Sequence, residues 1–424
     1  MVDTSLATDA TPAVRLEDLT PLPYQQALAA HLQAQEPEVW QWAASAQARE
    51  QHAAAVRTEL LRNSYRLDAA AHPDLHAHAQ LAAQRLGVTA SITLYQAGDG
   101  AMNAAIHCVP GEAHIVLSGP LLERLQGPEL QAVLGHELAH YLLWALDGGK
   151  YHVVDRLLHA TASDPRADAS HLQAARRFAL YTEAFADRGA CVACGALEPA
   201  VSALIKIETG LTQVNVASYL AQAEEICADP TARNTQTRGT SHPEVFVRAR
   251  ALRLWTELQH DAQDWLAAAL EGPLALDTLD MLGQQRVSAV TRATIAQLLQ
   301  RPFLQSEPLL AHARRFFPDF APARSPTSLT SPVPALPPPD PVPAGLHDYL
   351  ASVLVDFVAA DPELDDLALA AALGLADALG CAEPFEQRVL KDLRVPKRSL
   401  ARVKRDAAAL LDKAATEHTK AAAA

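Results

Sequence analysis

The chain has 424 residues, of which 49% are hydrophobic and only 5% aromatic, and its formal net charge is −14. This alanine- and leucine-rich composition predicts a soluble, mostly helical protein with room for one large or two medium domains. The negative charge argues against binding to nucleic acid or to an anionic membrane surface. There is no run of about 18 uncharged apolar residues, the first residues show no basic segment followed by an apolar one, and five cysteines are too few for a disulfide framework. We therefore expect a cytoplasmic protein without a membrane span.

Taken in chain order, residues 1–20 predict a flexible tail, because they are rich in Thr, Ala and Asp and show no sustained period. Apolar residues then recur at spacings of three and four over 23–86, which is typical of helices. Three short, turn-bounded runs follow and predict strands, namely Ser91–Tyr95, a weaker Met102–Cys108, and His114–Leu117. The first part of the chain is therefore expected to combine helices with a small sheet.

Helical patterning resumes over Leu121–Leu146, where a break at Gly127 separates two predicted helices and Gly148 ends the second. Helical stretches then dominate from Ala174 to Phe316. Because no linker composition interrupts these elements, we expect a single domain over 21–316.

The composition changes abruptly after this domain. Segment 317–345 contains APARSPTSLTSPVPALPPPDPVPAG, which is dense in proline and nearly free of lysine and arginine, and it predicts an extended, semi-rigid linker. Helical periodicity returns over 346–412 and predicts a small separate bundle, a candidate for docking a protein partner. Residues 413–424 are expected to form a second flexible tail.

The sequence QAVLGHELAHYLL carries the strongest chemical signal of the chain. An α-helix repeats every 3.6 residues, so His136 and His140 project from one face and can hold one zinc ion through two imidazole nitrogens. Glu137 lies beside the first histidine, where a carboxylate can take a proton from a zinc-bound water, as in HExxH metallopeptidases. The same five-residue pattern also occurs by chance in unrelated helices, so its context decides between the two interpretations.

A tetrahedral zinc ion needs a third protein ligand besides an open position for water. Glu183 and Asp187, in the segment YTEAFAD, are four apart on a predicted amphipathic helix, so both carboxylates face one way. The first can bind the metal while the second accepts the free N–H of a ligand histidine. Two acids on a helix more often form a solvated face, but the apolar and small neighbours Phe185 and Gly189 favour burial against the HELAH helix.

The segment SHPEVFVRARAL has two interpretations. Ser241 and Glu244 form a capping-box pattern, and proline in the first turn suits a helix start, which requires no chemistry. Alternatively, His242 at the helix N-terminus and a buried Arg248 two turns later can stabilise the oxyanion of a tetrahedral intermediate opposite the zinc. His242 could instead bind the metal in a resting state.

Taken together, HELAH, EAFAD, SHPEVFVRARAL and the lead-in NAAIHC…AHIVLSGPLLERLQGPELQAVLG resemble the HtpX-like and CAAX-prenyl-protease-like zinc metallopeptidases of the gluzincin class over roughly 55–260. The resemblance implies a mainly α (α+β) fold, with a zincin-like domain that has a small β-sheet, followed here by the Pro-rich linker and the helical bundle. It also implies one Zn²⁺ per chain and a role for each matching residue: zinc ligands His136, His140 and Glu183, general base Glu137, orienting carboxylate Asp187, and transition-state groups His242 and Arg248.

The chain departs from this family in two ways. Many members are embedded in membranes and none of those spans is found here, which puts a prenylated membrane-protein substrate in doubt. The family often has an aromatic residue after the Asn-Ala of its substrate-facing strand, whereas Asn103 and Ala104 are followed by Ala105. We still expect Asn103 and Ala104 to bind substrate. The C-terminal segment is weakly similar to TerB-like helical domains.

These observations predict a zinc-dependent endopeptidase that hydrolyses unfolded or flexible polypeptides, with a role in protein quality control or stress response. The alternative is a non-catalytic, zinc-stabilised peptide-binding or adaptor module that recruits partners through its C-terminal bundle. Two further motifs are discounted. Cys191 and Cys194 lie in a predicted continuous helix as core residues, and His72 and His76 flank Pro73, which predicts a helix start rather than a metal site.

Overall fold

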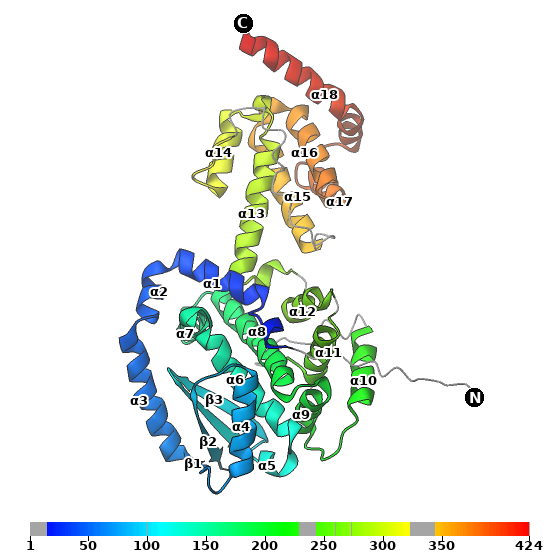
Figure 1. The fold of residues 1–424 in the computed structure, drawn as a ribbon. Coiled ribbons are helices and arrows are strands. Elements are labelled where there is room, and N and C mark those ends of the chain that lie inside the picture. The colour runs from blue at the N-terminus through cyan, green and yellow to red at the C-terminus, as the bar shows by residue number, and fades with distance from the viewer. Residues whose placement is uncertain are drawn as a thin grey trace, which may run out of the picture. The chain divides into compact units, whose positions relative to one another are not determined.

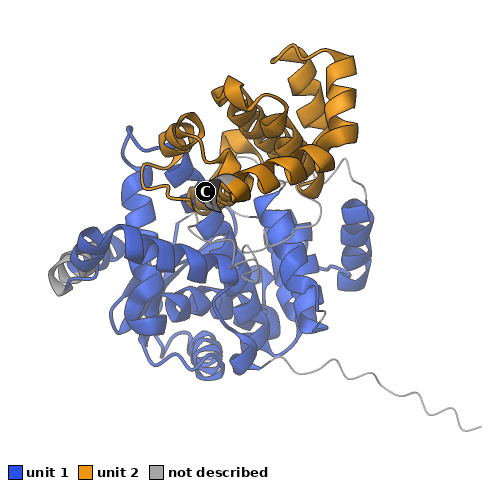
Figure 2. Ribbon diagram, turned by 90° about the horizontal axis from the view of Figure 1, so that it is seen from above, with its two compact units in different colours: residues 1–272 blue, residues 273–424 orange. Residues whose placement is uncertain are grey.

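The computed structural model describes residues 15–98, 100–228, 243–258, 260–272, 274–322 and 344–423. The chain divides into two compact units, residues 1–272 and residues 273–424 (Figure 2). Over the described residues, no helix is long and apolar enough to cross a membrane.

The first unit combines helices with one small sheet (Figure 1). Its helices are α1 (Pro23–Gln35), α2 (Pro37–Ala43), α3 (Ala46–Asn63), α4 (Pro73–Arg85), α5 (Leu121–Arg124), α6 (Pro128–Ala145), α7 (Lys150–Ala162), α8 (Ala169–Cys194), α9 (Leu197–Thr209), α10 (Val216–Ala228), α11 (Val245–Thr256) and α12 (Ala262–Glu271). Its strands are β1 (Ser64–Arg66), β2 (Ser91–Ala97), β3 (Asn103–Val109) and β4 (Glu112–Ser118). The expected mainly α (α+β) class is therefore confirmed, and the three expected strands are present.

The sheet has the order β1-β2-β4-β3, in which β2 and β4 are parallel and the other two pairs are antiparallel. Residues of α3 pack with Tyr95 and Val109 on one face, while α4 and α6 contact strands β2, β3 and β4. Strand β3 lies at one edge and pairs with β4 alone among the described strands. This free edge faces the region in which the candidate site is found.

Several local predictions need correction. Strand β1 lies within the stretch predicted to be helical, because its three residues are held by pairing with the end of β2 rather than by any pattern of their own. Helix α7 was not predicted, and α8 begins at Ala169 rather than near Ala174. Helix α11 begins at Val245 with Glu244 at its N-cap, so it does not start at the predicted capping box, whose Ser241 lies outside the described residues.

Helices α6 and α8 cross unusually closely because glycine lies at both points of contact. A Cβ atom added at Gly135 of α6 would overlap the Cβ of Ala193, and one added at Gly189 of α8 would overlap the Cβ of Ala139. Side chains of normal size would push the helices apart, since packed helix axes are usually 8–10 Å apart. The small residues therefore bring the histidine-bearing face of α6 against the acidic face of α8.

The described residues of the second unit form helices and the segments that connect them, and none of these residues is in a strand. Its helices are α13 (Met281–Leu298), α14 (Glu307–Phe316), α15 (Ala344–Ala360), α16 (Asp366–Ala378), α17 (Ala382–Lys391) and α18 (Lys397–Ala423). We expected the first domain to reach residue 316, but Ile295 and Leu309 of α13 and α14 share one hydrophobic core with Leu350 and Leu373 of α15 and α16.

The chain therefore divides after Gly272, and the predicted linker 317–345 falls within the second unit. Most of that linker, residues 323–343, lies outside the described structure. Helix α18 continues to Ala423, where an irregular tail was expected from residue 413.

Candidate metal centre

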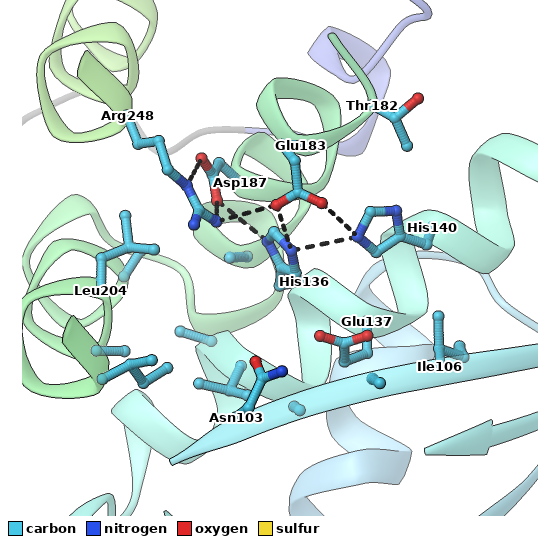
Figure 3. A pocket seen from close by; sticks show the side chains of 18 of the residues that line it. Asn103, Ile106, His136, Glu137, His140, Thr182, Glu183, Asp187, Leu204 and Arg248 are labelled. Atoms are coloured by element: carbon cyan, nitrogen blue, oxygen red, sulfur yellow. Dashed lines mark hydrogen bonds and ion pairs between the residues drawn. The ribbon is translucent and has the colours of Figure 1, made fainter. Parts of the chain in front are cut away.

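Three potential metal ligands meet where α6 and α8 cross (Figure 3). The Nε2 atoms of His136 and His140 are 3.2 Å apart, because the two residues are one turn apart on α6. Glu183 projects from α8 toward both rings, with its carboxylate oxygens 3.5 Å from His136 Nε2 and 3.6 Å from His140 Nε2. The three residues predicted from sequence as metal ligands are thus brought together.

This geometry fits a zinc ion. Imidazole and carboxylate ligands lie about 2.0–2.2 Å from zinc, so two ligands at a tetrahedral angle are separated by about 3.3–3.6 Å. The separations of 3.5 and 3.6 Å fall within this range, and that of 3.2 Å lies just below it. Burial also lowers the pKa of His140 to about 4, which keeps its imidazole neutral and its lone pair available at neutral pH.

Asp187 lies one turn after Glu183 on α8 and contacts the opposite side of the His136 ring. Its Oδ1 is 3.1 Å from His136 Nδ1, so the carboxylate can accept a hydrogen bond from the Nδ1–H group. This contact directs Nε2 of the same ring toward Glu183 and His140. The Asp187 side chain is only 3% exposed. A carboxylate in this position can fix the tautomer of His136, and a ligand histidine with a fixed tautomer is a stronger ligand.

Arg248 of α11 binds this carboxylate through two charge-assisted hydrogen bonds. Its Nη2 and Nε atoms donate to the two Asp187 oxygens at 2.6 and 2.8 Å, and Nη2 also lies 3.5 Å from Glu183 Oε2. Although burial alone would raise the pKa of Asp187, Arg248 lowers it below its usual value. The sequence predicted Arg248 as an oxyanion-stabilising group, but its guanidinium is engaged by the two acids of α8. His242 lies outside the described residues.

Glu137 lies on α6 beside the two histidines and faces strand β3 (Figure 3). The residue is 6% exposed, and burial raises the pKa of its carboxyl to about 7. The carboxyl is separate from the contacts that join His136, His140 and Glu183, so it is available to a water molecule or a substrate. This arrangement suits a general base, for which a pKa near the working pH is most effective.

A cavity of about 470 Å³ contains the three candidate ligands and Glu137. Strand β3 forms part of its wall, and Asn103 and Ala104 are among the lining residues; Figure 3 shows Asn103 on this strand. Helices α7, α8, α9 and α11 contribute other lining residues. The cavity therefore joins the metal centre to the free edge of the sheet.

Several residues of this cavity were missed by sequence reasoning. They are Trp144 of α6, Asp155 of α7, Thr182 of α8 and Glu208 of α9. Asp155 could have been found from its setting, since the apolar residues Val154 and Leu158 lie one position before and three positions after it in the same helix. The signal was overlooked because the stretch after Gly149 was not predicted to be a helix.

Comparisons with known proteins agree with this chemistry. Residues 60–160, which include the HELAH segment, match the SprT-like family. A protein named plastoglobule-localized metallopeptidase 48, chloroplastic, from Arabidopsis thaliana is 30% identical over 199 residues, which cover 43% of this chain and 57% of that protein. The chain is related to metallopeptidases. No solved structure matches it.

The extent of this kinship is limited. The chain spans just over half the length of the curated relative that it matches, and the SprT-like match ends before α8, which carries Glu183 and Asp187. These two matches do not support the finer resemblance to HtpX-like and CAAX-prenyl-protease-like enzymes. They also do not support the TerB-like resemblance of the C-terminal segment.

Proposed function

We propose that this protein is a zinc endopeptidase in which His136, His140 and Glu183 hold one Zn²⁺ and Glu137 is the general base. The observation that carries the proposal is the position of Glu137, a buried carboxyl in the same cavity as three donor atoms with the spacing of zinc ligands. A structural zinc site is usually closed by four protein ligands, whereas a catalytic site has three and a vacant position. Three ligands and an adjacent base favour catalysis.

Bound zinc would supply Lewis acidity, which lowers the pKa of a water ligand to about 7 and polarises a carbonyl. Glu137 accepts a proton from the attacking water and then donates it to the amine of the departing half of the substrate. Asp187 holds the Nδ1 proton of His136, and Arg248 keeps the Asp187 carboxylate charged and in place. We assign Arg248 this positioning role. His242 remains our candidate for stabilising the oxyanion.

The polypeptide substrate would add to the free edge of β3. An extended chain beside this strand forms main-chain hydrogen bonds that do not depend on its sequence, and it passes the residues Asn103 and Ala104 on its way to Glu137. Only an unfolded or flexible segment can take this form. The geometry therefore supports hydrolysis of unfolded polypeptides and a role in protein quality control.

The finer assignments are proposals of the same kind. The carboxylate pair Glu183 and Asp187 supports membership of the gluzincin group, within which we favour the HtpX-like and CAAX-prenyl-protease-like enzymes. All five cysteines are free, which supports a reducing compartment such as the cytoplasm. The helical second unit is proposed to bind a protein partner.

The test compares zinc-loaded wild type with Glu137→Gln on casein as an unfolded substrate. We expect the variant to lose about 10²- to 10⁴-fold in turnover, the usual contribution of a general base. Its zinc content, measured by plasma mass spectrometry, should stay near one ion per chain. Glu225→Gln, which removes an exposed carboxylate from α10, is the matched control and should cleave as wild type does.

Two results would contradict the proposal. Equal cleavage by wild type and Glu137→Gln would show that another group activates water. If zinc-loaded wild type cleaves none of a broad panel of unfolded proteins, the peptidase hypothesis is wrong and the non-catalytic adaptor is the better interpretation. An anomalous-scattering map at the zinc edge would establish the ligands in either case.

A further inference from the structure

The wall of the cavity formed by α7 carries an acid that the proposed chemistry does not use. Asp155 lines the cavity with His140 and Glu137, but it takes no part in the contacts that join the three candidate ligands. Within the described parts of the chain, no hydrogen-bond donor or cationic side chain lies within bonding distance of its carboxylate. The charge of His159, one turn further along α7, acts on this carboxyl through space and favours its ionised form.

The side chain of Asp155 is partly buried in the wall of the cavity. Burial raises the pKa of its carboxyl above the usual value, because the charged form loses part of its hydration. A buried carboxylate is normally paired with a cation or accepts hydrogen bonds. Asp155 has neither among the described residues, and it faces a space large enough for a side chain, which points to a ligand that brings its own positive charge.

Ring contacts place Asp155 close to the metal centre. The Trp144 indole lies 6.0 Å from the ring of His140 and 5.8 Å from that of His152, measured between centroids. Residues three apart share a face of a helix, so Asp155 lies on the same side of α7 as His152. The row of rings from His140 through Trp144 therefore ends at His152, on the side of α7 that also carries Asp155, and Trp144 and Asp155 line the same cavity.

Strand β3 gives the position a direction. Figure 3 shows Glu137 between Asn103 and Ile106 of β3, with His140 on the side of Ile106. Trp144 contacts the ring of His140 and also that of His152 on α7, the helix that carries Asp155. Asp155 is therefore placed on the Ile106 side, and a chain extended along β3 would pass Asn103 and Asp155 on different sides of Glu137.

We propose that Asp155 is a specificity-determining residue that binds a lysine or arginine side chain of the substrate, at one fixed position on the α7 side of the cleaved bond. The inference rests on the proposed peptidase function, because it requires a polypeptide bound along β3. A charge-assisted pair in such a setting favours a basic residue over a neutral one by about 10- to 100-fold.

The experiment is digestion of a proteome-derived peptide library by the full-length, zinc-loaded protein, with the cleavage sites mapped by mass spectrometry. We expect lysine and arginine to be enriched at one position. Asp155→Asn should abolish this enrichment while it still cleaves peptides that have a neutral residue there, and Asp155→Lys should replace it with enrichment of Asp and Glu. Loss of fold alone would produce no such reversal.

Glu208→Gln is the matched control, because it removes one negative charge from the same cavity but from α9. It should keep the enrichment that Asp155→Asn loses. If the two variants weaken the enrichment equally, the preference arises from the overall charge of the cavity and the local assignment is wrong. Cleavage by wild type without any basic preference overturns the inference and leaves the peptidase function intact.

A binding measurement covers the case in which no cleavage occurs. Zinc-loaded Glu137→Gln is titrated with two labelled peptides that differ only in lysine or norleucine at a single position, with that position moved through the peptide in a series. Tighter binding of a lysine peptide, lost in Glu137→Gln/Asp155→Asn, supports the Asp155 assignment even if the protein is an adaptor. Equal affinities throughout the series contradict it.

Discussion

The two units bury acidic side chains for different purposes. In the second unit, Asp361 is 5% exposed and accepts a hydrogen bond from the backbone N–H of Glu363 at the start of a short 3-10 helix. In the first unit, Asp187 is 2% exposed and its carboxylate contacts the side chains of His136 and Arg248. Burial of an acid therefore does not indicate function by itself, whereas contact with titratable side chains beside a cavity does.

Glycine differs between the units in the same way. Gly189 in α8 allows a close crossing with α6, while Gly374 in α16 has open space where its Cβ would be. The first glycine is required by packing and the second is not. Both contrasts can be tested with the same substitution made in each unit.

The largest effect is expected at Glu183. Replacing it by alanine removes the only carboxylate among the three candidate ligands, so bound zinc and peptidase activity should both fall below detection. Asp361→Ala in the second unit should lose about 1 kcal/mol of stability as a helix cap and keep its zinc. Zinc content after dialysis is the measurement, and full retention of zinc by Glu183→Ala would disprove the ligand assignment.

A smaller effect is expected at Asp187. Asparagine there still fits the space but weakens the hold on His136 Nδ1, and loss of such an orienting partner typically lowers metal affinity about 10- to 100-fold. Asp361→Asn is the counterpart in the second unit and should leave zinc affinity unchanged. Competition against a chromogenic chelator measures both, on samples whose circular dichroism spectra show that they are folded. If the two variants bind zinc with equal affinity, Asp187 has no special role in holding the metal, and the contrast between the buried acids of the two units is wrong.

The smallest effect is expected at the glycines. Gly189→Ala should destabilise the first unit by about 1–3 kcal/mol, because the added methyl group collides with Ala139 and overpacked cores lose about this much. Gly374→Ala should instead stabilise its helix by roughly 0.5–1 kcal/mol, since alanine restricts the unfolded chain and meets no neighbour. Urea denaturation of each variant gives the sign, and a stabilised Gly189→Ala would show that the crossing is looser than described.

Much of the metal centre could be predicted from the sequence because it depends on helical periodicity. His136 and His140 are four apart, as are Glu183 and Asp187, so each pair must share a face once its helix forms. The strands of β2, β3 and β4 were also recognisable from their short apolar runs. These features are local, and local spacing is what a single sequence displays.

Tertiary structure decided the remainder. The pairing that forms β1 depends on a strand more than 20 residues away, the engagement of Arg248 by Asp187 depends on how α11 meets α8, and the place of Asp155 in the cavity depends on how α7 folds back after α6. None of these is a periodic property of a segment. The sequence therefore determined which side chains lie together on one face of a helix. The packing of separate helices determined which of these faces share a site, because a contact between distant segments produces no regular residue spacing in the sequence.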